Sequence, residues 1–191
     1  MCEAIEAYKD QFESVSIAEP MLGEVGSDAT VINADKEAVA KAITAAAVSE
    51  AGFESLEAAK DAGTAFVFMG HGTAHVAKVT YSQMQTQMQN LGYENVFIGT
   101  VEGEPEETSA EAVIEAVKAA GYTNVVLRPL MVVAGDHANN DMAGSDDDSW
   151  KTVFEAAGFT VDCQIHGLGE IADVQALYVA HTKAAIDALN A

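Results

Sequence analysis

The chain of 191 residues has a globular composition, 49% hydrophobic and 20% charged, and carries a formal net charge of −21. A field of that sign repels phosphate backbones and anionic lipids and attracts divalent cations, which argues against nucleic-acid and membrane partners. No apolar run reaches the roughly 20 residues of a membrane span, and the N-terminal MCEAIEAYKD lacks a signal-peptide pattern, so we expect a cytoplasmic protein.

The first 62 residues predict several helices but little sheet. We expect a short helix at 2–11, a strand at 14–22 that ends at Pro20, a helix at 36–48 capped by Asp35, and a helix at 56–61 capped by Ser55. One strand is too little for a sheet of its own. We interpret residues 1–62 as the partial remainder of a preceding domain; alternatively, the strand joins the edge of the following sheet.

Residues 63–191 alternate apolar strands with amphipathic helices. The expected strands are 64–70, 95–101, 124–135 and 159–167, and the expected helices are 75–90, 109–120, 149–157 and 171–190. Apolar runs without polar interruption are typical of a parallel sheet covered on both faces. The predicted fold is therefore α/β, doubly wound around a mainly parallel sheet, with 63–191 as a complete C-terminal domain that carries the functional site.

A side chain able to bind a metal lies at or just after the end of each of these strands: His71, Glu102, His137 and His166. Ligands bind outside the carboxyl ends of parallel strands, so we expect these side chains at one edge of the sheet. Two imidazoles and a carboxylate suit Co(II), Ni(II), Fe(II) or Zn(II). A set of three protein ligands leaves coordination positions open for a substrate.

Ordinary structural roles compete with each of these assignments. A single histidine after a strand is more often a loop residue bonded to backbone, and Glu102 lies in an acidic stretch. His75 could pair with His71 if residues 71–75 were helical, whereas His181 fits a surface or packing role. The aspartates at 146–148 fit a cap for the next helix. Nucleotide-binding glycine loops and nucleophile elbows are absent from the sequence, so no organic cofactor is expected.

Four segments together resemble the anaerobic cobalt chelatase family of class II tetrapyrrole chelatases: FVFMGHGTAH (66–75), IGTVEGEPE (98–106), LRPLMVVAGDHANNDMAGSDDDSWK (127–151) and HGLGE (166–170). The resemblance implies a chelatase fold and insertion of Co(II) into sirohydrochlorin for cobalamin biosynthesis. It implies that His71 and His137 bind the metal with Glu102 as the acidic partner, and that His71 also takes pyrrole protons. Fe(II) and Ni(II) remain alternatives as the metal.

Further residues are candidates for contact with the tetrapyrrole. Gly70, Gly72 and Gly103 would let a planar ligand come close, and His75 and His166 lie nearby in sequence, His166 as a departure from the family and a candidate extra ligand. Arg128, Lys78 and Lys151 could meet substrate carboxylates, with ordinary surface roles as the alternative. Because the family has a complete first domain, a non-catalytic metal or tetrapyrrole carrier is the competing function, and self-association to rebuild a cleft stays open.

Overall fold

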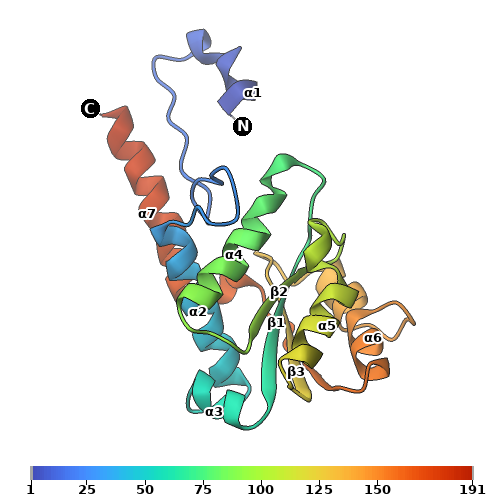
Figure 1. Ribbon diagram of the computed structural model, residues 1–191. Coiled ribbons are helices and arrows are strands. Elements are labelled where there is room, and N and C mark those ends of the chain that lie inside the picture. Colours follow the sequence, from blue (N-terminus) through green and yellow to red (C-terminus); the bar gives the residue numbers. More distant parts are fainter. Residues whose placement is uncertain (1, 191) are drawn as a thin grey trace.

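The computed structural model describes residues 2–190 and contains one four-stranded parallel sheet in the order β2-β1-β3-β4 (Figure 1). The strands are β1 (Thr64–Gly70), β2 (Val96–Thr100), β3 (Asn124–Pro129) and β4 (Thr160–Cys163). Every pair of neighbouring strands runs parallel. The carboxyl ends of all the strands therefore lie along one edge, which confirms the predicted doubly wound α/β class.

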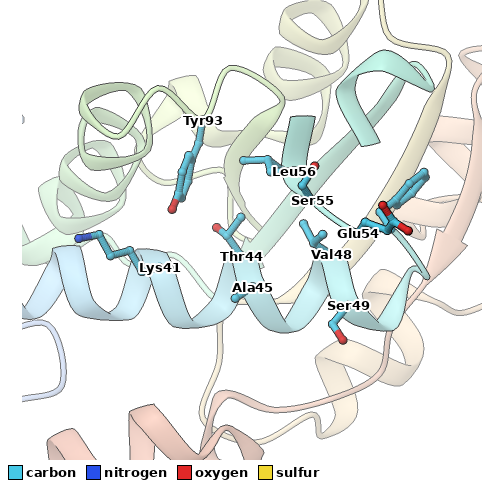
Figure 2. A pocket seen from close by; sticks show the side chains of 10 residues that line it. Lys41, Thr44, Ala45, Val48, Ser49, Glu54, Ser55, Leu56 and Tyr93 are labelled. Carbon is cyan, nitrogen blue, oxygen red and sulfur yellow. The ribbon is translucent and has the colours of Figure 1, made fainter. Parts of the chain in front are cut away.

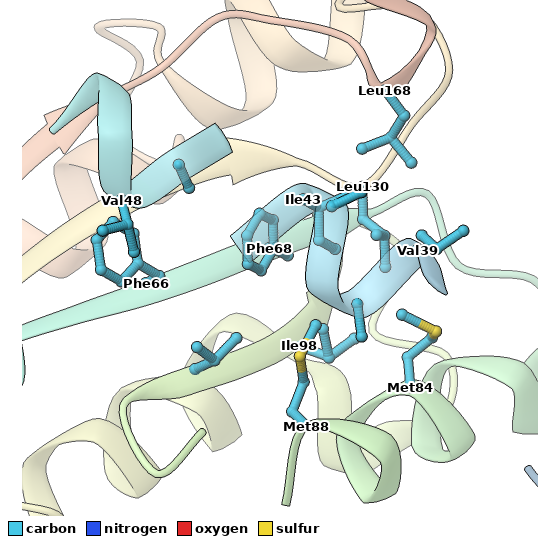
Figure 3. Close-up of a cluster of buried hydrophobic side chains, with 14 of the residues drawn as sticks. Val39, Ile43, Val48, Phe66, Phe68, Met84, Met88, Ile98, Leu130 and Leu168 are labelled. Atoms are coloured by element: carbon cyan, nitrogen blue, oxygen red, sulfur yellow. The ribbon is translucent and has the colours of Figure 1, made fainter. Parts of the chain in front are cut away.

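The sheet is buried on both faces, because its side chains pack into two separate apolar clusters, one on each face. All the residues of β1 are buried, and successive side chains point to opposite faces. Phe66 and Phe68 enter one cluster (Figure 3), whereas Val67 and Met69 enter the other. Burial of each such side chain stabilises the fold by about 1.5–3 kcal/mol. Because β1 lies between β2 and β3 and contributes to both clusters, it is the central strand of the core.

Helices cover both faces of the sheet. The first face is covered by α2 (Ala34–Glu50), α3 (Leu56–Asp61), α4 (Val79–Asn90) and the start of α7 (Ala172–Leu189), and the second by α5 (Ala110–Ala119) and α6 (Trp150–Ala156). Short 3-10 helices lie at Lys9–Gln11, Val76–Lys78, Glu106–Thr108 and Leu168–Glu170, and a π-helix lies at Ala138–Met142. No helix within residues 2–190 has the length and apolar character needed to cross a membrane.

The helix caps differ in part from those predicted. Ser55 caps α3 as expected, because its side chain accepts from the Ala58 N–H. Asn33 rather than Asp35 caps α2, since the helix begins earlier and Asp35 already lies in its first turn. Ser149 caps α6 by accepting from the Thr152 N–H, so the prediction that the preceding aspartates cap this helix was wrong.

Two strand predictions were also wrong. Residues 14–22 form no strand, and the free edge of β2 has no room for one because Gln85 occupies it. The Gln85 amide donates to the Val96 carbonyl at 3.2 Å and accepts from the Ile98 N–H at 2.8 Å. The segment 130–135 leaves the sheet after Pro129, because β1 ends at Gly70 and offers no further partner on that side.

The N-terminal residues form an arm that lies apart from the sheet (Figure 1). It contains α1 (Cys2–Glu6) and continues to the start of α2, where a buried lysine holds it. The Lys36 ammonium donates to the carbonyls of Leu22 at 2.8 Å and Glu24 at 2.7 Å. The helices α2 and α3 share the core of the sheet, and the division of the chain between residues 62 and 63 stays a prediction.

Candidate metal centre

Three of the predicted site residues meet at the carboxyl edge of the sheet. The ring centroids of His71 and His137 lie 4.7 Å apart with their planes at 79°. His71 Nε2 lies 4.0 Å from Glu102 Oε1. The side chains of His71, Glu102 and His137 are 49%, 54% and 39% exposed. The strands β1, β2 and β3 thus bring two imidazoles and a carboxylate together on an open rim.

Glycine allows the loops after β1 and β2 to lie against one another. Gly72 has φ of +91°, and a Cβ on it would lie 2.9 Å from Glu102 Cβ and 3.1 Å from Thr100 Cβ. Backbone bonds tie the same loops, since the Glu102 N–H donates to the His71 carbonyl at 2.9 Å. A side chain at position 72 would therefore push Glu102 away from His71.

A buried hydroxyl network holds the loop that carries Glu102. The Oγ1 atoms of Thr100 and Thr108 are 2.6 Å apart, and Thr108 donates to the Pro105 carbonyl at 2.6 Å. Thr100 Oγ1 also accepts from the Glu104 N–H at 3.1 Å. The loop is short and internally bonded, so Glu102 projects from a fixed base.

The hydrogen-bond partners of the two histidines leave the same ring nitrogen free in each. His71 Nδ1 lies 2.8 Å from the Gly72 carbonyl, and His137 Nδ1 lies 2.5 Å from Asp141 Oδ2. A carbonyl and a carboxylate are acceptors, so each Nδ1 carries the proton and donates it. The lone pair of each neutral imidazole is then on Nε2, the nitrogen available to a metal or a proton.

These side chains are close to, but not yet in, the geometry of a coordinated ion. Within residues 2–190 no group of three or more His, Cys, Asp or Glu side chains is already placed around one metal position. Metal–ligand distances are about 2.0–2.2 Å for nitrogen and oxygen donors, and the 4.0 Å between His71 Nε2 and Glu102 Oε1 is close to twice that length.

The neighbouring candidate histidines have other partners. His75 is exposed, and its Nδ1 accepts from the Ala77 N–H at 3.1 Å; residues 71–75 are not helical, so the predicted helical pair with His71 does not form. His166 lies between two carboxylates, with Nδ1 2.8 Å from Glu170 and Nε2 3.4 Å from Glu50. Both of its ring nitrogens are thus already engaged.

The cationic candidates are also engaged by the protein. Arg128 is 4% exposed and pairs with Glu50 at 2.5 Å and Gln164 at 2.8 Å, so the alternative of an ordinary surface residue was wrong. The Lys78 ammonium pairs with Glu104 at 2.6 Å. Lys151 lies in the first turn of α6 and is half-buried.

The remaining predicted residues have structural surroundings of their own. A Cβ on Gly70 would collide with the Tyr81 ring at 2.3 Å, and Gly103 has φ of +60° beside Ser109. His181 lies in α7, where its Nε2 is 3.2 Å from Asp35. Contact of Gly70 and Gly103 with a tetrapyrrole stays a prediction, whereas His181 has the packing role that was the expectation for it.

Two residues beside this site were not predicted from the sequence. Asp141 holds His137, and the spacing of four residues between them is the signal that could have revealed the pair. Glu50 links Arg128 and His166 across the fold, and no sequence pattern indicates a contact over that separation.

A separate hollow of about 380 Å³ lies between α2 and Tyr93 (Figure 2). Its lining includes Lys41, Thr44 and Tyr93, and Lys41 already pairs with Glu37 at 2.5 Å. Tyr93 and Leu56 precede β2 and β1 along the chain, which places the hollow at the amino end of the strands. It is therefore remote from the histidine pair.

The sequence is similar to a family of metal chelatases and to two proteins that are named as such chelatases. A family model described as cobalt chelatase (CbiK) matches residues 1–187. A "Sirohydrochlorin cobaltochelatase" of Salmonella typhimurium is 42% identical over 121 residues, which cover 63% of this chain and 44% of that protein. "Sirohydrochlorin cobaltochelatase CbiKC" of Nitratidesulfovibrio vulgaris is 30% identical over 188 residues, which cover 97% of this chain and 59% of that protein. The chain spans about half the length of these relatives.

Proposed function

The chain belongs to the cobalt chelatase (CbiK) family, and from that premise we propose that it inserts Co(II) into sirohydrochlorin. His71, His137 and Glu102 hold the ion before its transfer to the macrocycle. The single observation that carries this proposal is the pair of imidazoles in contact at 4.7 Å, beside a carboxylate 4.0 Å from one of them. Both imidazoles are hydrogen-bonded through Nδ1, and within residues 2–190 neither Nε2 takes part in a hydrogen bond.

The donor set suits a metal ion that is bound transiently and then transferred to the substrate. Two neutral imidazoles and one carboxylate bind a borderline divalent cation without enclosing it, and they leave positions open for pyrrole nitrogens. The exposed position of all these side chains lets the metal enter from solvent and lets the macrocycle approach from the same side. The same donors accept Fe(II) or Ni(II), so the metal used in the cell is decided by supply as well as by the site.

Insertion exchanges protons for the metal. As the ion passes to the macrocycle, two pyrrole nitrogens lose their protons and the two imidazoles release the metal ion. Each freed Nε2 has a lone pair that can accept a proton, which is the role of a general base in this exchange. His71 is the better placed acceptor because the Glu102 carboxylate lies 4.0 Å from its Nε2. Insertion is then electrically balanced, since one dication enters as two protons leave.

A non-catalytic metal or tetrapyrrole carrier is the second candidate. The observation that favours it is the openness of the site, whose three side chains are between 39% and 54% exposed. A chain that spans about half of its relatives could bind the ion yet distort the macrocycle poorly. Self-association would supply an opposing wall and is the corresponding proposal for oligomeric state.

Metallation of sirohydrochlorin separates the two functions. The purified chain is mixed with excess sirohydrochlorin and Co(II), and the absorbance change of metallation is compared with a protein-free reaction. Multiple equivalents per chain, formed faster than in the protein-free control, support the enzyme. A single equivalent followed by a stop supports the carrier, and no change beyond the control would contradict both.

A further inference from the structure

We propose, on the basis of the function proposed above, that Val132 and Val133 form the surface against which the macrocycle rests during metal transfer. Most of the large apolar side chains left exposed fall into two groups. One group lies on the N-terminal arm and α7, and the other lies on loops that follow the strands; the latter comprises Val76, Val132, Val133 and Ile165. The second group thus belongs to segments that follow β1, β3 and β4, beyond the carboxyl edge of the sheet at which the histidine pair lies.

The backbone beneath these valines is held firmly, unlike that of a mobile loop tip. The Leu168 N–H donates to the Met131 carbonyl at 2.8 Å, and the Gly169 N–H donates to the Val132 carbonyl at 2.9 Å. A Cβ on Gly167 would lie 2.5 Å from the Val132 oxygen and 2.9 Å from Val133 Cα. The HGLGE segment thus fits against residues 131–134 and leaves Val133, 72% exposed, directed to solvent.

The valines lie on the same loop as one proposed metal ligand. Val133 and His137 are four positions apart, so their Cα atoms are at most about 14 Å apart even in an extended chain. The chain turns back between them, because the Asn139 amide donates to the carbonyls of Ala134 and Gly135. On the neighbouring loop, the exposed Val76 follows His71 by five positions. An exposed apolar side chain therefore lies within five positions of each histidine along the chain.

The charges of the molecule favour a planar aromatic ring as the occupant of this surface. Sirohydrochlorin carries its carboxylates around its edge, and the chain has a net charge of −21. The nearby guanidinium of Arg128 is buried against Glu50, and the Lys78 ammonium pairs with Glu104. With these two cations engaged, the apolar face of the ring is the part of the macrocycle that valine methyl groups can contact without leaving a charge unpaired.

Binding of sirohydrochlorin to Val133→Ser, measured by the absorbance of the macrocycle, tests this surface. Val179→Ser is the matched control, because Val179 is 68% exposed but lies in the middle of α7. We expect Val133→Ser to weaken sirohydrochlorin binding about ten-fold, the effect of losing contact with part of a valine side chain. The Co(II) affinity should not change, since no metal ligand is removed, and Val179→Ser should match the parent in both measurements.

The outcomes separate this inference from the function on which it rests. Unchanged sirohydrochlorin binding by Val133→Ser, or an equal loss in Val179→Ser, would overturn the valine surface. A parent chain that binds Co(II) but no sirohydrochlorin would also overturn it and leave the metal site standing. A parent chain that binds no Co(II), while Val133→Ser still weakens sirohydrochlorin binding, would instead overturn the metal site and support the valine surface.

Discussion

Asp141 Oδ2 lies 2.5 Å from His137 Nδ1, one turn further along the chain at the π-helix, and so determines which ring nitrogen of His137 faces the rim. A carboxylate bonded to Nδ1 keeps the proton there, which leaves the lone pair of the ring on Nε2. The contact makes His137 the more firmly oriented of the two histidines, because His71 is held by a neutral backbone carbonyl.

Asp141→Asn should weaken Co(II) binding about 10- to 100-fold while leaving the fold intact. The amide keeps the shape of the carboxylate but can present an N–H to Nδ1, which would favour the wrong tautomer. Isothermal titration with Co(II) measures the effect. Asp146→Asn, in the exposed loop before α6, is the matched control and should bind like the parent. Equal affinities for parent and Asp141→Asn would show that the contact does not orient His137.

His71→Ala and His137→Ala should each abolish measurable Co(II) binding without unfolding the chain, because each removes one donor from an exposed set of three. Circular dichroism checks the fold and titration checks the metal. His75→Ala is the control, since His75 is exposed and its Nδ1 accepts from the Ala77 N–H to cap a short helix nearby. If His71→Ala or His137→Ala bound Co(II) with the affinity of the parent, the substituted histidine would not be a metal ligand.

Gly72→Ala should lower both stability and Co(II) affinity. The new Cβ meets Glu102 and Thr100 at about 3 Å and needs a left-handed backbone besides. Gly52→Ala isolates the backbone cost, because Gly52 has φ of +79° and nothing within 4 Å. We expect Gly52→Ala to cost about 1 kcal/mol and Gly72→Ala at least about 1 kcal/mol more in urea unfolding. Similar losses in the two variants would mean that Glu102 adapts freely.

Glu50→Ala should destabilise the fold by about 2–4 kcal/mol, because it removes the carboxylate from a buried guanidinium and leaves it the neutral Gln164 side chain. Within residues 2–190 the Arg128 Nε is already buried without a hydrogen bond. Glu37→Ala breaks the exposed pair with Lys41 and should cost no more than about 0.5 kcal/mol. Comparable free energies of unfolding for the two variants would contradict the buried role of Arg128.

Cys163 should be slow to alkylate near pH 8 in the folded protein, because burial raises the pKa of its thiol to about 11. In a Cys2→Ala background, the iodoacetamide rate should rise about ten-fold per pH unit up to pH 10. The urea-unfolded chain should instead react as an ordinary thiol of pKa about 8.5. Because the unfolded thiol loses its proton first, this group also makes stability fall as pH rises between those two values. A folded rate that levels off near pH 9 would contradict the burial effect.

Local sequence patterns were enough to predict the central strand of the sheet and the edge at which the candidate site lies. The unbroken apolar run at 64–70 predicts a buried parallel strand, because only a sheet covered on both faces hides every residue of such a run. The rule that ligands lie beyond the carboxyl ends of strands then placed His71, Glu102 and His137 at one edge, and the structure brings them into contact. Those predictions depend on spacing along single strands.

Contacts between distant segments were decided only by the tertiary structure. Residues 130–135 are apolar enough for a strand, yet they leave the sheet because β1 has ended beside them, and Val133 becomes exposed. Arg128 is buried because Glu50 and Gln164 converge on it from other elements. The burial of a residue and the partner of each ring nitrogen depend on which elements meet, and that information lies in the packing of the whole chain.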